Sequence, residues 1–144
     1  MTAVNISDIL RHKGRDVVTI APDQTVTALL AALAERNVGA LVVVENDEVV
    51  GMVSERDVVR RIAAHGANLL DAPVREIMST DVLTTTSHNS VDSVGQAMTE
   101  RHIRHMPVID EGRLVGIVSI GDVVSSRIRQ LEKDRGQLEH YIAG

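Results

Sequence analysis

The sequence repeats itself, and the repeat limits the folds that this chain can adopt. An offset of 65 positions aligns residues 16–59 with residues 81–124 without a gap, and 15 of the 44 aligned positions are identical. The strongest match pairs GMVSERDVV (51–59) with GIVSIGDVV (116–124). Two copies are too few for a solenoid, in which each repeat contacts only its neighbours. The repeat therefore predicts two similar units that pack as a pseudo-symmetric pair.

Each copy predicts the same order of secondary structure. In the first copy, TVTALLAALAERN (25–37) has apolar residues at helical spacing, and Thr25 is placed to cap the helix. ALVVV (40–44) and VVGMVS (49–54) predict a hairpin of buried strands, preceded by a short β-branched stretch and followed by a second helix. The unit is therefore strand–helix–strand–strand–helix, a mixed α/β (α+β) fold. We expect a first motif at 5–66, a linker at 67–73, a second motif at 74–127 and a helical tail at 128–144.

The composition excludes several classes of function. The chain has no cysteine, so disulfides and thiolate metal sites are absent, and its single aromatic residue cannot build a platform for stacking nucleic-acid bases. The formal net charge of −5 argues against a general nucleic-acid surface or an acidic membrane surface. No apolar run approaches the roughly 18 residues that span a bilayer, and MTAVNISDIL does not resemble a signal peptide. We therefore expect a cytoplasmic protein that binds neither nucleic acid nor membrane.

A serine and an aspartate recur where the last strand of each copy meets the following helix. Ser54 and Asp57, like Ser119 and Asp122, are three residues apart, as in a capping box that satisfies the free amides of a helix start. The same geometry suits a ligand, because a carboxylate accepts two hydrogen bonds from a ribose diol and the free amides bind phosphate. A cap alone does not explain why the preceding glycine also recurs in register. Both interpretations stay open at this point.

These residues carry a resemblance to a known family. Both copies resemble CBS motifs, and the chain resembles a stand-alone tandem CBS pair, or Bateman module. IRHMPV (103–108) followed by GRLVGIVSIGD (112–122) is specific for the family, and VREIM (74–78) resembles the segment that usually leads into a motif. ISDIL (6–10) resembles VREIM and leads into the first copy. The resemblance covers roughly residues 5–127.

The resemblance implies two three-stranded sheets and two clefts between the copies that bind adenine nucleotides. AMP, ADP and ATP are the expected ligands, S-adenosylmethionine and NAD are possible, and no metal is required. The motif aspartates would hold the ribose hydroxyls and the motif serines would lie by the ribose or phosphate. The residues that the resemblance places in the clefts are Thr19, Gly39, Ala40, Ser54 and Asp57, and in the second copy Thr84, Arg104, His105, Met106, Pro107, Ser119 and Asp122.

The two copies are not chemically equivalent. Arg104 and His105 can reach a phosphate with positive charge, whereas the first copy has Gly39 and Ala40 at those positions. The first copy instead carries Arg56, which we include among the binding residues, and Gly121 replaces it in the second. We therefore expect the two sites to differ in affinity or in ligand.

Other signals are weaker. His102 and His105 are three residues apart, but no third ligand of a suitable type is near, so we expect no metal site. No nucleotide-hydrolase, dehydrogenase or protease motif is present, so we expect no enzyme activity. The tail has Ile128, Leu131, Leu138 and Ile142 on one helical face, with Gly136 expected to kink or end the helix. That face either packs on its own chain or contacts a partner.

The sequence thus predicts a regulatory, energy-sensing module that binds adenosine-containing ligands and signals to an unidentified partner by a change of conformation. CBS pairs commonly pair with one another, so the resemblance also implies a homodimer. The alternative is a ligand-free, constitutively homodimeric interaction scaffold, in which the Ser-x-x-Asp groups only cap helices.

Overall fold

The two copies form separate units, but the unit boundaries do not follow the repeat. The computed structural model describes the backbone of residues 4–143 and the side chains of residues 4–138. One unit spans Asp16–Leu83, and the other combines the chain up to Arg15 with the chain from Thr84 onward. The segment that leads into the first copy therefore belongs to the unit built by the second copy.

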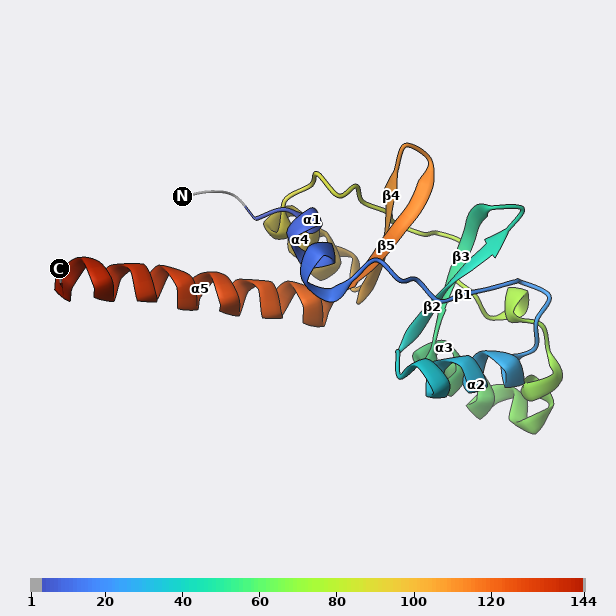
Figure 1. Ribbon diagram of the computed structural model, residues 1–144. Coiled ribbons are helices and arrows are strands. Elements are labelled where there is room, and N and C mark those ends of the chain that lie inside the picture. The colour runs from blue at the N-terminus through green and yellow to red at the C-terminus, as the bar shows by residue number, and fades with distance from the viewer. Residues whose placement is uncertain (1–3, 144) are drawn as a thin grey trace. The chain divides into compact units, whose positions relative to one another are not determined.

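The first unit has a three-stranded sheet beside two α-helices (Figure 1). Strand β1 runs parallel to β2, and β2 pairs with β3 in an antiparallel hairpin. This is the order strand–helix–strand–strand–helix that the sequence predicts. The elements are β1 (Thr19–Ile20), α2 (Val26–Arg36), β2 (Ala40–Glu45), β3 (Glu48–Ser54), α3 (Glu55–His65), and the short 3-10 helices η1 (Gly66–Asp71) and η2 (Val74–Glu76).

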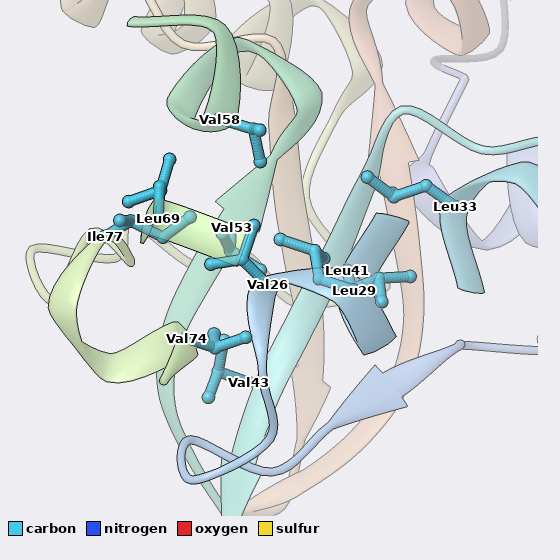
Figure 2. Close-up of a cluster of buried hydrophobic side chains, with 10 residues drawn as sticks. All are labelled: Val26, Leu29, Leu33, Leu41, Val43, Val53, Val58, Leu69, Val74 and Ile77. Carbon is cyan, nitrogen blue, oxygen red and sulfur yellow. The ribbon is translucent and has the colours of Figure 1, made fainter. Parts of the chain in front are cut away.

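Aliphatic side chains fill the core of the first unit (Figure 2). Helix α2 contributes one apolar face, and the central strand β2 contributes residues that are fully buried, such as Leu41 and Val43. The core contains no aromatic ring, so branched side chains supply its buried apolar area. Its members are Val26, Leu29, Leu33, Leu41, Val43, Val53, Val58, Leu69, Val74 and Ile77.

The second unit repeats this pattern with a smaller sheet. Strands β4 and β5 form an antiparallel hairpin, and the segment that corresponds to β1 makes a single parallel bridge between Thr85 and Val108. Pro107 explains the shortening, because it stands at the position of Val42, whose amide donates to the Val18 carbonyl in the first copy. The expected third strand is thus reduced to one bridge. The elements are α1 (Ile6–Lys13), α4 (Val91–Arg101), β4 (His105–Asp110), β5 (Arg113–Ser119) and α5 (Ile120–Ala143).

Most local signals in the sequence act as expected. The hydroxyl of Thr25 accepts a hydrogen bond from the Ala28 amide, and Gly66 ends α3 at a φ of 68°. Of the two outcomes expected at Gly136, a kink or an end, the structure excludes the end, because α5 continues to Ala143. A single glycine costs an exposed helix only about 1 kcal/mol, which neighbouring turns can offset. The side chain of Ile142 lies outside the described residues.

The two segments that lead into the copies are exchanged between the units, and the repeated glycine marks where each one docks. We name residues 6–13 the first flank and residues 74–79 the second flank. Leu10 of the first flank packs on Gly116, where an added Cβ would lie 2.6 Å from its Cδ2 atom. The second flank packs on Gly51, where a Cβ would lie 2.8 Å from both the Met78 sulfur and the Ser79 carbonyl oxygen. The glycine recurs because a neighbouring segment lies too close for any side chain.

Candidate functional site

The Ser54–Asp57 pair forms a complete capping box at the junction of β3 and α3. The Asp57 Oδ2 atom accepts from the Ser54 amide at 2.8 Å and from the Ser54 hydroxyl at 3.1 Å. The Asp57 amide donates to the Ser54 hydroxyl oxygen at 3.3 Å. These bonds fix the carboxylate at the helix start, where the helix dipole favours negative charge. Because the capping bonds engage Oδ2, capping by itself uses one oxygen of the carboxylate.

The Ser119–Asp122 pair repeats this box at the junction of β5 and α5 and adds a cation. The Ser119 amide donates to Asp122 Oδ2 at 2.8 Å, and the Asp122 amide donates to the Ser119 hydroxyl at 3.1 Å. Lys13, at the end of α1, donates its ammonium to the same Oδ2 atom at 2.7 Å. The capping interpretation is therefore correct in both copies, and the two boxes differ in the charge that surrounds them.

The pKa of Asp122 lies below its usual range. Partial burial raises the pKa of this carboxyl group, but the hydrogen bonds from Lys13 and from the Ser119 amide, with the charge of Lys13, outweigh that effect. A lowered pKa in the folded state means that the carboxylate stabilises the fold above about pH 4. This contribution is lost as the pH falls through the lowered pKa, so Asp122 is fully ionised at neutral pH.

The residues just before and at the start of the first hairpin strand lie beside each junction. In the first copy, Ala40 pairs with Ser54 across the hairpin, and the Gly39 carbonyl accepts from the Glu55 amide at 3.1 Å. The second copy has the same arrangement: His105 pairs with Ser119, and the Arg104 carbonyl accepts from the Ile120 amide at 2.8 Å. The fold thus brings four predicted site residues together in each copy. They are Gly39, Ala40, Ser54 and Asp57, and Arg104, His105, Ser119 and Asp122.

The other predicted site residues lie in different surroundings. Thr19 is exposed on β1 and pairs with Val42, and Thr84 is exposed one residue before the bridge at Thr85. Arg56 is exposed in the first turn of α3. Met106 and Pro107 are both buried within β4, and because they are consecutive on the strand their side chains point to opposite faces of the hairpin.

The two histidines that raised the question of a metal have different structural positions. His102 ends α4 in the left-handed conformation at a φ of 55°, as Asn37 ends α2 at 54°, whereas His105 lies within β4. Among the residues that the structure describes, no group of three or more histidine, aspartate or glutamate side chains is placed to hold a metal ion. None of the described helices is both long and apolar enough to cross a membrane.

Comparison with known proteins identifies the family. The model of the CBS domain matches residues 4–64 and again residues 74–129. The chain belongs to the CBS domain family and carries two of its domains, which are non-catalytic modules. A match to inosine-5'-monophosphate dehydrogenase of Thermoplasma acidophilum is 30% identical but covers only 22% of that enzyme.

Relatives match most of the chain. It is 34% identical to the mitochondrial CBS domain-containing protein CBSX3 of Arabidopsis thaliana, over 99% of this chain and 73% of that protein. It is 35% identical to the CBS domain-containing protein YhcV of Bacillus subtilis, over 78% and 79%. The crystal structure of ATU1752 from Agrobacterium tumefaciens has a TM-score of 0.84 at 39% identity, over 88% and 95%. The CBS pair of MJ0100, solved with 5'-methylthioadenosine and S-adenosyl-L-methionine, has a TM-score of 0.77 at 26% identity, over 91% and 99%.

The sequence did not reveal that Lys13 contacts the second junction. Lys13 and Asp122 are 109 positions apart, and no periodicity or motif connects them. The partial signal was the resemblance of ISDIL (6–10) to VREIM (74–78), which marks both segments as parts of the repeat. It does not tell which unit each segment joins.

Proposed function

We propose that this chain is a regulatory module that binds an adenosine-containing ligand at the Ser-x-x-Asp junctions of its CBS domains. AMP, ADP and ATP are the first candidates, followed by S-adenosylmethionine and NAD. The observation that carries the proposal is the matched geometry of the two junctions. Each joins an aspartate held by its cap to the start of the neighbouring strand, in a chain whose relative MJ0100 was solved with two adenosyl compounds.

The proposed chemistry follows from the capping geometry. A ribose presents two adjacent hydroxyl groups as donors, and a carboxylate fixed by its own backbone can accept both without being reoriented. Asp57 and Asp122 would accept from the ribose, while Ser54 and Ser119 with the nearby helix amides would face the phosphate or sugar. Thr19 and Thr84 stay predictions as residues that line the clefts, and Met106 and Pro107 stay predictions as contacts of the base and phosphates.

Signalling would occur by a shift between conformations. A ligand that binds two arrangements of the CBS domains unequally changes their populations, and a partner protein then recognises the favoured arrangement. Signalling to a partner protein and the cytoplasmic location stay predictions. The competing function is a scaffold that binds no nucleotide, in which both aspartates serve only as caps.

A ligand screen by thermal shift distinguishes these functions. A ligand present at 100 times its Kd should stabilise the chain by about 2.7 kcal/mol, which raises the Tm by roughly 5–10 °C. We expect AMP, ATP or S-adenosylmethionine to give such a shift, and Asp57→Ala and Asp122→Ala each to remove part of it. If no adenosyl compound changes the Tm at millimolar concentration, the nucleotide proposal is wrong and the scaffold remains.

The aspartate variants need a control for the loss of a cap, which costs about 1 kcal/mol by itself. Thr25→Ala removes the cap of α2. The Thr25 hydroxyl accepts a hydrogen bond from the Ala28 amide at 3.1 Å and is exposed, outside the proposed site. The substitution should lower the Tm of the free protein by a similar amount and leave the ligand-induced shift unchanged. An equal loss of the ligand shift in Thr25→Ala and in both aspartate variants would contradict the assignment of Asp57 and Asp122.

We further propose that the chain forms a homodimer through α5. Val124, Ile128, Leu131 and Leu138 are all at least half exposed on this helix, at spacings of four, three and seven residues. This is the heptad spacing of helices that pack side by side. A structural relative, the CBS-CP12 protein, is described as hexameric, which supports self-association in the family but not a particular geometry.

We call Val124, Ile128, Leu131 and Leu138 the α5 stripe. Leu131→Glu tests the proposed dimer, because it places a charge at the most exposed position of the stripe. We expect light scattering to show a dimer for the wild type and a monomer for Leu131→Glu. Gln137→Glu adds the same charge to an exposed position of α5 outside the stripe and should stay dimeric. A monomeric wild type at micromolar concentration would refute the proposed dimer.

A further inference from the structure

At the second junction, the ammonium group of Lys13 already contacts the aspartate that is proposed to bind ribose. This ammonium donates to Asp122 Oδ2 at 2.7 Å and to the Ile117 carbonyl at 3.0 Å. The side chains of Lys13 and Asp122 are 33% and 21% exposed, so solvent weakens the ion pair only in part. Two acceptors from one unit hold the ammonium in place on the carboxylate that is proposed to bind ribose.

Among the residues that the structure describes, no cation occupies the first junction in this way. The hydrogen bonds described for Asp57 come from Ser54, and among the described residues the ion pairs are Lys13–Asp122, Arg11–Asp8 and Arg127–Asp92. The flanks themselves explain the difference. Leu10 and Met78 dock on equivalent glycines, and three positions further along the chain lie Lys13, at the end of the first flank, and Asp81, just beyond the second flank.

A ribose diol that engages both carboxylate oxygens competes with the Lys13 ammonium for Oδ2, while Oδ1 takes part in none of the described hydrogen bonds. A charge-assisted hydrogen bond is stronger than one from a neutral hydroxyl, so an uncharged nucleoside must displace a better donor. A phosphorylated nucleoside is different, because it offers the displaced ammonium a new anion. Arg104 and His105, placed beside Ser119, add further donors suited to phosphate at this junction.

We propose that Lys13 is a specificity-determining residue: it restricts the Asp122 junction to adenosyl ligands that carry phosphate, and leaves the Asp57 junction open to those without. This inference rests on the proposed function, since it concerns the ligand class of the same two sites. It predicts that adenosine binds predominantly at Asp57, and that AMP and ATP bind at both aspartates.

The test measures each junction separately by isothermal titration calorimetry with adenosine and AMP. In the Asp57→Ala variant only the Asp122 junction can bind a ligand through its aspartate. Lys13→Met is then added to that variant, because methionine keeps the apolar stem of the lysine without its charge. We expect Lys13→Met to strengthen adenosine binding at this junction about three- to tenfold, the range expected for a partly exposed ion pair. AMP binding should be unchanged or weaker, while Lys13→Arg should retain the wild-type preference.

Arg11→Met is the matched control. Arg11 lies on the same helix as Lys13 and pairs with Asp8 instead of Asp122. Arg11→Met removes the same positive charge as Lys13→Met. It should leave the preference at the Asp122 junction unchanged. If Arg11→Met and Lys13→Met change adenosine binding equally, the effect is general electrostatics and the inference is wrong.

A second measurement needs no ligand. The pKa of Asp122, followed by carboxyl NMR, should rise in Lys13→Met, because a hydrogen bond and a positive charge that lower it are removed. A rise without any change in adenosine binding would refute the specificity role while confirming the contact. If neither adenosine nor AMP nor any other adenosyl compound binds the wild type or any variant, the proposed function itself fails. If AMP binds and the adenosine affinity of the Asp122 junction does not respond to Lys13→Met, only this inference fails.

Discussion

Replacing Leu10 by alanine should lower the free energy of unfolding by about 2–5 kcal/mol, the cost of truncating a buried leucine. Leu10 is 1% exposed, and its methyl groups fill the space above Gly116. The damage should fall on the second copy, although Leu10 precedes the first. Urea denaturation measures the loss, and hydrogen exchange locates it. Amides of β4 and β5 should lose protection while those of β2 and β3 keep theirs, and the reverse pattern would contradict the exchange of flanks.

A double-mutant cycle tests the contact directly. Gly116→Ala alone should cost about 1–3 kcal/mol, because the new methyl group would lie within 2.6 Å of a Leu10 methyl carbon. In the Leu10→Ala background the obstructing methyl groups are absent, so the added Cβ should cost much less. We therefore expect the double variant to lose less free energy of unfolding than the two single variants lose together. Additive effects would mean that the two residues do not touch.

Gly51→Ala should destabilise the first unit by about 2–3 kcal/mol, more than Gly116→Ala destabilises the second. At Gly51 the obstacle includes backbone: the Ser79 carbonyl oxygen would be 2.8 Å from the new Cβ. That oxygen accepts from the Met52 amide at 2.9 Å, and the Ser79 amide donates to the Met52 carbonyl at 2.8 Å. The second flank cannot retreat without weakening both hydrogen bonds, whereas Leu10 can change its rotamer.

Gly121→Ala is the matched control for this measurement. Gly121 lies in the first turn of α5, and the nearest atom to an added Cβ would be the Ser119 hydroxyl at an ordinary 3.5 Å. This variant should be neutral or more stable by up to about 1 kcal/mol, because alanine favours a helix. Chemical denaturation of the three glycine variants compares them. A Gly51→Ala variant as stable as Gly121→Ala would show that the second flank does not pack on β3 as described.

The elements of this fold could be predicted because their causes are local. Apolar spacing places α2, Thr25 caps it, and Gly66 ends α3. The exchange of flanks could not be predicted, because the pattern of ISDIL shows which face is apolar but not which unit covers it. The reduced strand of the second copy was foreseeable, since Pro107 has no amide hydrogen to pair with such a strand.

The candidate site is predictable to a similar extent. The Ser-x-x-Asp spacing predicts both capping boxes, and the hairpin register brings Gly39 and Arg104 to them. The charge around the second box depends on Lys13, whose partner is distant in the sequence. Whether Asp57 and Asp122 hold a ribose stays a prediction, because a cap and a diol site require the same two residues.

The exchanged flanks also set the order in which the units can be completed on the ribosome. Residues 16–83 are contiguous, so all contacts within that unit can form once they have emerged. Helix α1 can make its contact with β5 only after β5 has been synthesised. Leu10 and Gly116 are 106 positions apart, so at about 5–20 residues per second the helix waits roughly 5–20 s. During that interval the apolar face formed by Ile6, Ile9 and Leu10 lacks its contact with β5. The nascent chain therefore exposes an apolar segment until β5 has been synthesised.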